Sequence, residues 1–336
     1  MKLLLVKTSS MGDVLCAMPA VTDAARALPG VEVDWVVEEA FAELPAMHRA
    51  VRATIPVALR RWRRAPMQGA GEAGAFLRRL RERRYDRVVD SQGLLKSAAI
   101  ALLARGPVSG FDWGSAREPA ATLIYGCHHA VPPERHAIER QRALFAAALG
   151  YRMPEGGPDY GLVLPGAGSC GRYLVFATQT SWPSKRWPQR YWRALAERAS
   201  AESTVVYLPW HGEAERSDIE AIARDLAGVE AVRTATLTEL VALIAGAQAV
   251  VAPDTGAAHL AAACGVPAVV LYGATAPALT GTVGPGQRHL AAVFPCSPCR
   301  ARECRYRGPA ETVPACYASL PPDAVWRSLQ HARASR

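Results

Sequence analysis

Short apolar runs alternate with longer amphipathic segments along most of this chain. The runs are rich in Val, Ile and Leu, which is typical of strands buried in a parallel sheet. In the first half we expect strands at 3–6, 33–37 and 87–90 and helices at 19–28, 76–84 and 93–104. In the second half we expect strands at 174–177, 204–208, 249–252 and 268–272 and helices at 188–199, 213–226, 237–245 and 257–263.

The alternation of strands and helices predicts the fold class. Strand–helix–strand units form parallel sheets, so we expect an α/β protein with doubly wound, Rossmann-like sheets. Residues 153–171 interrupt the pattern with three Pro and six Gly, which marks a boundary. We therefore expect a domain at 1–155, a second domain at 172–320 and a closing helix at 321–336. Ligands of such folds bind at the carboxyl ends of the strands, so we expect the functional residues in the turns that follow the strands.

Charge adds a preference for anionic partners. The 336 residues carry a net charge of +9, and residues 1–150 hold 21 Lys and Arg against 15 Asp and Glu. Arg is densest between 60 and 87, around a Gly-rich stretch at 68–74 that we expect to be a mobile loop. No apolar run reaches the roughly 18–20 residues of a spanning helix, and the first apolar run is too short for a signal peptide. We expect a cytoplasmic protein whose membrane contact is at most peripheral.

The turn after the first strand holds the first candidate for chemistry. Residues 8–13 read Thr-Ser-Ser-Met-Gly-Asp and lead from a strand into a helix, where backbone N–H groups and the helix dipole favour an anion. Asp13 has two interpretations, a general base that removes a proton from a hydroxyl or an N-cap of the helix. The single Gly does not make the three-glycine dinucleotide fingerprint, which argues against a nicotinamide-dependent oxidoreductase.

Two loops in the second half could bind a phosphate-containing ligand. The segment 180–188 places hydroxyls, Lys185 and an Arg between a strand and a helix, although a solvated loop has the same composition. The segment 252–259 opens a helix with Gly256, where the backbone can approach a pyrophosphate closely. His259 could donate to a phosphate or be a packing residue. The chain has no Asp-x-Asp triplet for a divalent metal, and Lys185 with the helix N-terminus could neutralise a diphosphate instead.

Two further clusters allow either a functional or a structural interpretation. Residues 60–64 read Arg-Arg-Trp-Arg-Arg, which could bind carboxylates and phosphates or form a solvated basic face, and no nucleic-acid-binding signature accompanies them. Four of the eight cysteines follow the spacing C-x2-C-x4-C-x11-C at 296–316, which is compatible with a metal but matches no standard zinc finger. We expect reduced thiols here and at the scattered Cys16, Cys127, Cys170 and Cys264.

These motifs, in this order, resemble the glycosyltransferase family that contains the lipopolysaccharide heptosyltransferases, above all its type I branch. The resemblance runs from residue 1 to about 275 and so includes both expected domains. It is carried by VKTSSMGDVLCAMPAVTDA (6–24), DWVVEEAF (34–41), IPVALRRWRR (55–64), DSQGLLKSA (90–98), AREP (116–119), LPW (208–210) and PDTGAAHL (253–260).

The resemblance implies a GT-B architecture, with two Rossmann-like domains facing a cleft, and an inverting transfer that requires no cofactor. The implied donor is ADP-L-glycero-D-manno-heptose, bound mainly by the second domain. The implied acceptor is the first Kdo sugar of Kdo2-lipid A, bound by the first domain. Such an acceptor implies peripheral contact with the anionic cytoplasmic face of the inner membrane and no nucleic-acid partner. The cysteine-rich tail resembles type II members, so a type II enzyme that adds a later core heptose is the alternative.

Residue roles follow from the resemblance position by position. Asp13 is implied to be the catalytic base, and no metal ligand is implied. The residues implied to bind the donor are Thr180, Ser181, Lys185, Glu213, Asp254, Thr255, Gly256 and His259. Glu215 rivals Glu213 for the ribose. The residues implied to bind the acceptor are Lys7, Ser10, Arg60, Arg61, Arg63, Arg64, Lys96 and Arg117.

Overall fold

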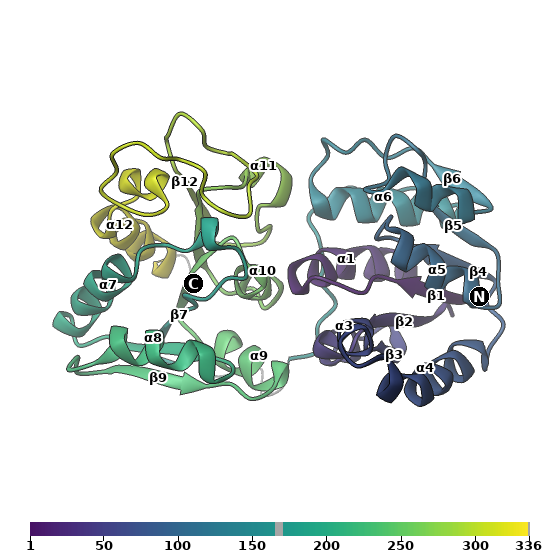
Figure 1. Cartoon of the computed structure of the whole chain (residues 1–336), viewed down its shortest axis with the longest axis horizontal. Helices are drawn as coiled ribbons and strands as arrows, with labels where there is room; N and C mark the ends of the chain where they lie inside the picture. Colours follow the sequence, from purple (N-terminus) through teal and green to yellow (C-terminus); the bar gives the residue numbers. More distant parts are fainter. Residues whose placement is uncertain (165–170, 335–336) are drawn as a thin grey trace. The chain divides into compact units, whose positions relative to one another are not determined.

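The chain folds into two compact units, which we describe from a computed structural model. Unit 1 spans Met1–Val163 and unit 2 spans Leu164–Arg336. The structure describes residues 1–164 and 171–334, apart from the side chains of 66–68. Each unit is built on a six-stranded sheet whose neighbouring strands run parallel and are flanked by helices (Figure 1).

Unit 1 is a doubly wound sheet with the strand order β3-β2-β1-β4-β5-β6. The order reverses direction between β1 and β4, which is the switch point of a Rossmann-like sheet. The described strands are β1 (Lys2–Val6), β2 (Glu32–Glu38), β3 (Val51–Val57), β4 (Arg87–Asp90), β5 (Val108–Phe111) and β6 (Cys127–His129). The described helices are α1 (Met11–Ala27), η1 (Glu39–Phe41), α2 (Glu43–Ala46), α3 (Leu59–Arg64), α4 (Pro66–Arg81), α5 (Leu95–Leu103), η2 (Pro119–Ile124) and α6 (Ala137–Leu149).

Unit 2 repeats this topology. Its strand order is β12-β11-β10-β7-β8-β9, and read from the β9 edge it corresponds strand by strand to the order of unit 1. The sequence shows no repeat, so this likeness appears only in the structure. The described strands are β7 (Tyr173–Phe176), β8 (Val205–Trp210), β9 (Val229–Arg233), β10 (Ala249–Pro253), β11 (Ala268–Tyr272) and β12 (Gln287–Ala291). The described helices are η3 (Pro183–Lys185), α7 (Gln189–Ala201), α8 (Glu213–Ala223), α9 (Leu237–Ala245), α10 (Gly256–Ala263), α11 (Pro277–Thr280), η4 (Ala315–Ser319) and α12 (Pro322–Arg333).

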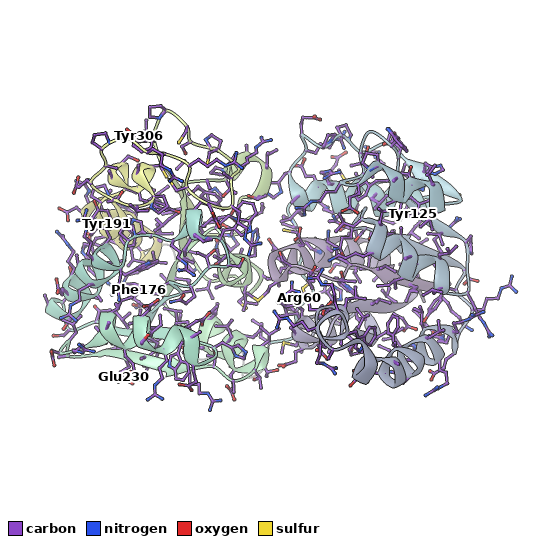
Figure 2. The ribbon with its side chains drawn as sticks, in the orientation of Figure 1. Arg60, Tyr125, Phe176, Tyr191, Glu230 and Tyr306 are labelled. Carbon is purple, nitrogen blue, oxygen red and sulfur yellow. The ribbon has the colours of Figure 1, made fainter. Side chains whose placement is uncertain are left out.

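Strand register decides which turns meet at each switch point. Val6 of β1 pairs with Asp90 of β4, so the residues that follow them leave the sheet side by side. In unit 2, Val251 of β10 pairs with Phe176 of β7, whose side chain is labelled in Figure 2. Doubly wound sheets bind their ligands beyond the carboxyl ends of the strands at this point. Each unit therefore has one position where a site is expected.

The closing helix belongs to the second core. Trp326 and Leu329 of α12 are buried in one apolar cluster with Leu174 and Phe176 of β7 and Trp192 of α7. Burying such side chains stabilises a fold by about 1.5–3 kcal/mol each. None of the helices within the described ranges has the length and apolarity that crossing a membrane requires.

Two expectations about helices in unit 1 are wrong. Helix α1 begins at Met11, with Ser10 as its N-cap, and contains Pro19 in its interior instead of starting there. The buried run from Val14 to Ala24 packs the helix in place despite the hydrogen bond that Pro removes. The stretch 68–74 lies inside α4 and is not a loop. Gly69 permits close packing there, because a Cβ at this position would lie 2.7 Å from Cδ1 of Trp62.

Candidate functional site

A pocket lies at the switch point of unit 1. Its volume is about 130 Å³, roughly ten times what one water molecule needs. Residues after β1, after β4 and on α6 line it together with the start of α1. The lining residues are Lys7, Ser9, Asp13, Ser91, Gln92, Phe111, Ser115, Arg117, Ala137, Arg140 and Gln141.

The first turn of α1 holds Asp13 in the lining of this pocket. Its Oδ2 accepts hydrogen bonds from the backbone N–H and the hydroxyl of Ser10, both at 2.8 Å. Asp13 is therefore the third residue of the helix and completes a capping box, whereas the N-cap itself is Ser10. Among the described residues no donor is assigned to Oδ1, so this oxygen can accept a proton from a ligand.

The electrostatic surroundings keep Asp13 ionised. Burial raises the pKa of Asp13, but the charge of Lys7, the two hydrogen bonds from Ser10 and the charge of Arg117 together hold it below its ordinary value. Lys7 is buried, and its Nζ donates to the Ser91 carbonyl at 3.1 Å. Arg117 is exposed and lines the pocket. The carboxylate form needed by a base is thus available at neutral pH.

Asp90 orders the loop after β4, whose residues Ser91 and Gln92 line the pocket. It is fully buried at the end of β4 and accepts hydrogen bonds from the hydroxyls of Ser97 and Tyr125, at 2.8 and 2.7 Å. It also accepts the backbone N–H groups of Gln92 and Gly93. Burial raises the pKa of Asp90 above its ordinary value despite these bonds. The loop after β4 is therefore ordered by a carboxyl group that does not reach the pocket lining.

Among the remaining expected acceptor residues, only Lys7 and Arg117 join Asp13 in the pocket lining. Ser10 is exposed and holds Asp13. Lys96 is exposed on α5 and lies outside the pocket lining.

The four arginines of α3 differ in whether acidic residues of the protein balance their charge. Arg61 is bound to Glu39 and Glu72, at 2.8 and 2.7 Å, so its charge is balanced within the protein. The guanidinium of Arg60 lies 5.6 Å from the ring centre of Phe41, and Figure 2 labels this side chain on α3. Arg63 and Arg64 are exposed. The basic face available to an anion is therefore formed by Arg60, Arg63 and Arg64.

In unit 2 the two loops that are expected to bind the donor meet through an ion pair. Nζ of Lys185 lies 2.7 Å from Oδ2 of Asp254 and also donates to the Asp254 carbonyl. The hydroxyl of Thr275 donates to the same carboxylate at 2.6 Å, and Nε2 of His259 lies 3.7 Å from its other oxygen. Burial raises the pKa of Asp254, but the neighbouring His259 and Lys185 lower it far more, so the group is ionised. The loops after β7 and β10 thus form one polar cluster.

The other expected donor residues lie around this cluster or on α8. Thr255 is the N-cap of α10, and its hydroxyl is buried without a hydrogen-bond partner among the described residues. Gly256 begins α10, while Thr180 and Ser181 lie in the loop between β7 and η3. Glu213 begins α8 and is exposed, whereas Glu215 accepts the backbone N–H of His211. Among the described residues, no hydrogen bond or ion pair joins Glu213 or Glu215 to the Asp254 cluster.

The four clustered cysteines are free thiols in this structure. Burial, together with the smaller effect of the neighbouring Cys296, Cys304 and Cys299, raises the pKa of Cys316 to about 11. Within the described ranges, no group of three or more His, Cys, Asp or Glu side chains is arranged to hold a metal ion. Cys170 lies outside the described residues.

The sequence did not identify several residues of the sites. Ser91, Arg140 and Gln141 line the first pocket, and Thr275 binds Asp254. Arg140 and Gln141 lie on a helix that the apolar pattern did not predict, so no motif pointed to them. Ser91 lies within DSQGLLKSA, where its place directly after a buried strand was the available signal.

Comparison with known proteins decides the family. The profile described as glycosyltransferase family 9 (heptosyltransferase) matches residues 73–309. The chain belongs to glycosyltransferase family 9. It is therefore a glycosyltransferase of the heptosyltransferase family, as the motifs indicated.

Curated members of family 9 extend the similarity to nearly the whole chain. Lipopolysaccharide heptosyltransferase 1 of Pseudomonas aeruginosa is 46% identical over an alignment of 345 positions, which covers 98% of this chain and 97% of the relative. The protein of the same name from Escherichia coli K12 is 43% identical, over 85% of this chain and 92% of the relative. Lipopolysaccharide heptosyltransferase 2 of Escherichia coli K12 is 33% identical, over only 29% of this chain and 30% of the relative.

Solved structures confirm the expected fold class of this family 9 member. The Escherichia coli heptosyltransferase WaaC with ADP is 38% identical, with a TM-score of 0.86 over 99% of this chain and 100% of that chain. Escherichia coli ADP-heptose lps heptosyltransferase II is 22% identical, with a TM-score of 0.78 over 99% of each chain, and shows the shared fold. The two Rossmann-like units are those of the GT-B architecture.

Proposed function

We propose that this chain transfers L-glycero-D-manno-heptose from ADP-heptose to the first Kdo of Kdo2-lipid A, with inversion at the anomeric carbon. The observation that carries the proposal is the position of Asp13. It is an ionised carboxylate, held by Ser10, in the lining of a pocket that Lys7 and Arg117 make positive. This combination suits a base that deprotonates a hydroxyl of an anionic sugar.

Similarity favours the type I acceptor over the type II acceptor. The chain matches proteins named lipopolysaccharide heptosyltransferase 1 over 98% and 85% of its length, and one named heptosyltransferase 2 over 29%. The donor assignment is supported by WaaC structures described as containing ADP and ADP-2-deoxy-2-fluoro heptose. The alternative is an enzyme that adds a later core heptose, which the cysteine-rich tail alone favours.

In the proposed reaction, Asp13 takes the proton of the Kdo hydroxyl while its oxygen attacks the anomeric carbon. The bond from that carbon to the ADP oxygen breaks through an oxocarbenium-like transition state, and one displacement inverts the configuration. Lys185 and the N-terminus of α10 supply positive charge to the departing diphosphate. Thr180, Ser181, Thr255, Gly256 and His259 surround the diphosphate and heptose. Glu213, or its rival Glu215, binds the ribose.

The remaining basic residues are proposed to guide the lipid acceptor. Arg60, Arg63 and Arg64 are exposed on α3 and are suited to phosphates of lipid A and to the anionic cytoplasmic surface of the inner membrane. Lys96 on α5 is proposed to add its positive charge to the attraction of the lipid phosphates. Arg61 is proposed to act by holding α3 against Glu39 and Glu72 while its guanidinium faces solvent.

The test is ADP release from ADP-heptose, with and without Kdo2-lipid A, by the wild type and by Asp13→Asn. We expect acceptor-dependent release that the substitution lowers by roughly 10²–10⁴-fold, while the Kd for ADP is unchanged. Asn keeps an oxygen for the Ser10 N–H, so the capping box and the fold survive and the loss reports proton transfer. Near-normal kcat in Asp13→Asn would exclude Asp13 as the base.

A matched control and a second acceptor separate the alternatives. Glu239 caps α9 by accepting the Ala235 N–H, as Asp13 caps α1, so Glu239→Gln should leave ADP release unchanged. Release with a core that already carries one heptose, but none with Kdo2-lipid A, would keep the family and assign a type II reaction.

A further inference from the structure

Three residues that line the unit 1 pocket each have a buried polar atom without a hydrogen-bond partner in the described part of the chain. The hydroxyl of Ser91, Nε of Arg140 and Oε1 of Gln141 have no hydrogen-bond partner among the residues that the structure describes. Ser91 is fully buried and Gln141 is 6% exposed, and all three residues line the pocket. A buried polar group without a partner costs about 1–3 kcal/mol, so three in one pocket indicate that a ligand supplies the partners.

The orientation of Gln141 is fixed by its other contact. Its Nε2 donates to the Ser91 carbonyl at 3.2 Å, and Lys7 Nζ donates to the same oxygen. Reversing the amide would place two acceptor oxygens against each other, so Oε1 is the atom that remains for a ligand. It is an acceptor and needs a donor such as a hydroxyl.

Arg140 contributes a directed positive charge. Its Nη2 donates to the Ser115 carbonyl at 2.6 Å, and its guanidinium lies 4.8 Å from the ring centre of Phe111. These two contacts hold the side chain in one orientation while Nε is unused. Lys7 and Arg117 line the same pocket, so its three cations suit a carboxylate or another anion.

We propose that Ser91, Arg140 and Gln141 form a subsite that binds the carboxylate and a neighbouring hydroxyl of the acceptor sugar beside Asp13. Ser91 Oγ and Arg140 Nε donate to the carboxylate, and Gln141 Oε1 accepts from the hydroxyl. A phosphate dianion would satisfy the two donors but would leave Oε1 unpaired. A sugar acid satisfies all three, and it orients the ring so that a second hydroxyl can face Asp13.

This inference rests on the proposed function, because Kdo is the carboxylate-bearing sugar of the acceptor. It also assigns the carboxylate to the pocket of unit 1 and leaves the α3 arginines to the lipid phosphates. Ser91, Arg140 and Gln141 are then specificity residues, distinct from the proposed base.

The test compares Ser91→Ala and Gln141→Met with the wild type on two acceptors, Kdo2-lipid A and an analogue whose acceptor carboxylate is reduced to a primary alcohol. Ser91→Ala should raise the KM for Kdo2-lipid A roughly tenfold, because it removes a hydrogen bond to a charged group. It should change the KM for the alcohol analogue by twofold or less. The KM for ADP-heptose should not change.

Stability separates this role from a structural one. Since the Ser91 hydroxyl has no partner within the described chain, Ser91→Ala should not lower Tm. Ser328→Ala, which replaces a buried Ser on α12, is the matched control and should leave both acceptor KM values unchanged.

The outcomes distinguish the two proposals. If the wild type uses Kdo2-lipid A but Ser91→Ala and Gln141→Met leave its KM within twofold, or raise it equally for both acceptors, the subsite is wrong and the function stands. If the wild type releases no ADP with Kdo2-lipid A, the function fails, and the carboxylate assignment fails with it.

Discussion

Two carboxyl groups near the unit 1 switch point have opposite electrostatic environments. Asp13 receives positive charge from Lys7 and Arg117, which lowers its pKa, whereas burial raises the pKa of Asp90. Asp13 lies in the pocket lining, while Asp90 is enclosed by Ser97, Tyr125 and the loop that it orders. The same chemical group therefore serves as a proposed base in one place and as a structural anchor in the other, because its neighbours differ.

The residue-scale prediction concerns His48, which ties α1 to the segment after α2. The residue is buried, with Nε2 3.0 Å from the Thr22 hydroxyl and Nδ1 accepting the Ala50 N–H. Burial lowers the pKa of His48 to about 4, against about 6.5 in an unfolded chain. Between these values the unfolded chain binds more protons, so stability is lost as pH falls through this window.

We expect the free energy of unfolding to fall by about 2 kcal/mol between pH 7 and pH 5 through this residue alone. Urea unfolding at the two pH values, for the wild type and His48→Gln, measures it. The variant should lack this share of the pH dependence. An equal loss in both proteins would show that His48 does not titrate in this way.

At the residue scale, motifs that follow buried strands pointed to Asp13, Lys185 and Asp254, and the family resemblance added Lys7. The structure places these residues in polar clusters at the two switch points, while their functional roles stay predictions. The sequence could not show that Arg61 is paired with Glu39 and Glu72, because that pairing depends on how η1, α3 and α4 pack together. A run of arginines in a sequence does not show which of them form ion pairs within the protein.

Each strand that the apolar pattern predicted has a neighbouring strand on both sides in its sheet. β1, β4, β7, β10 and β11 are flanked on both sides in their sheets, and their side chains are almost entirely buried, which gives continuous apolar runs. The strands β3, β5, β6, β9 and β12 were missed. All but β5 lie at the edge of a sheet with a mixed burial pattern, so their sequences lack such a run. β5 is central and buried, but its four residues read Val-Ser-Gly-Phe, which is not a continuous apolar run. The missed α6 carries both Arg140 and Gln141, which explains why the pocket was only partly predicted.

The element-scale prediction concerns the contact between β5 and the loop before β6. A Cβ at Gly110 of β5 would lie 2.4 Å from Cε2 of Tyr125, the residue whose hydroxyl donates to Asp90. Gly110→Ala should push the ring aside and break that hydrogen bond. We expect a loss of roughly 1–3 kcal/mol of stability and a higher acceptor KM, because the loop after β4 loses an anchor.

Gly126→Ala is the control for this variant. A Cβ there would meet only the Val108 carbonyl at 3.6 Å, an ordinary contact. Thermal unfolding and acceptor KM should therefore change in Gly110→Ala and not in Gly126→Ala. Equal behaviour of the two variants would mean that the packing of Tyr125 does not support the pocket.

At the scale of the whole molecule, one topology occurs twice with different chemistry. Both sheets follow the same strand path, and both place polar turns at the switch point. In unit 1 that position holds an ionised carboxylate beside a cationic pocket, and in unit 2 it holds a Lys–Asp cluster at the start of α10. The fold fixes where ligands bind, and the side chains after each strand determine which ligand each unit takes.

If unit 2 binds the donor and unit 1 binds the acceptor, ADP alone should protect segments of unit 2 from hydrogen exchange. At 100 times its Kd, a ligand stabilises the state it binds by about 2.7 kcal/mol. Hydrogen exchange followed by mass spectrometry should therefore slow in η3 and α10 of unit 2, and remain unchanged in residues 7–13 and 91–93 of unit 1. Lys185→Gln should weaken the effect, because it removes the cation proposed to meet the diphosphate. Protection centred on residues 7–13 would assign ADP to the unit 1 site and would reverse the proposed roles of the two units.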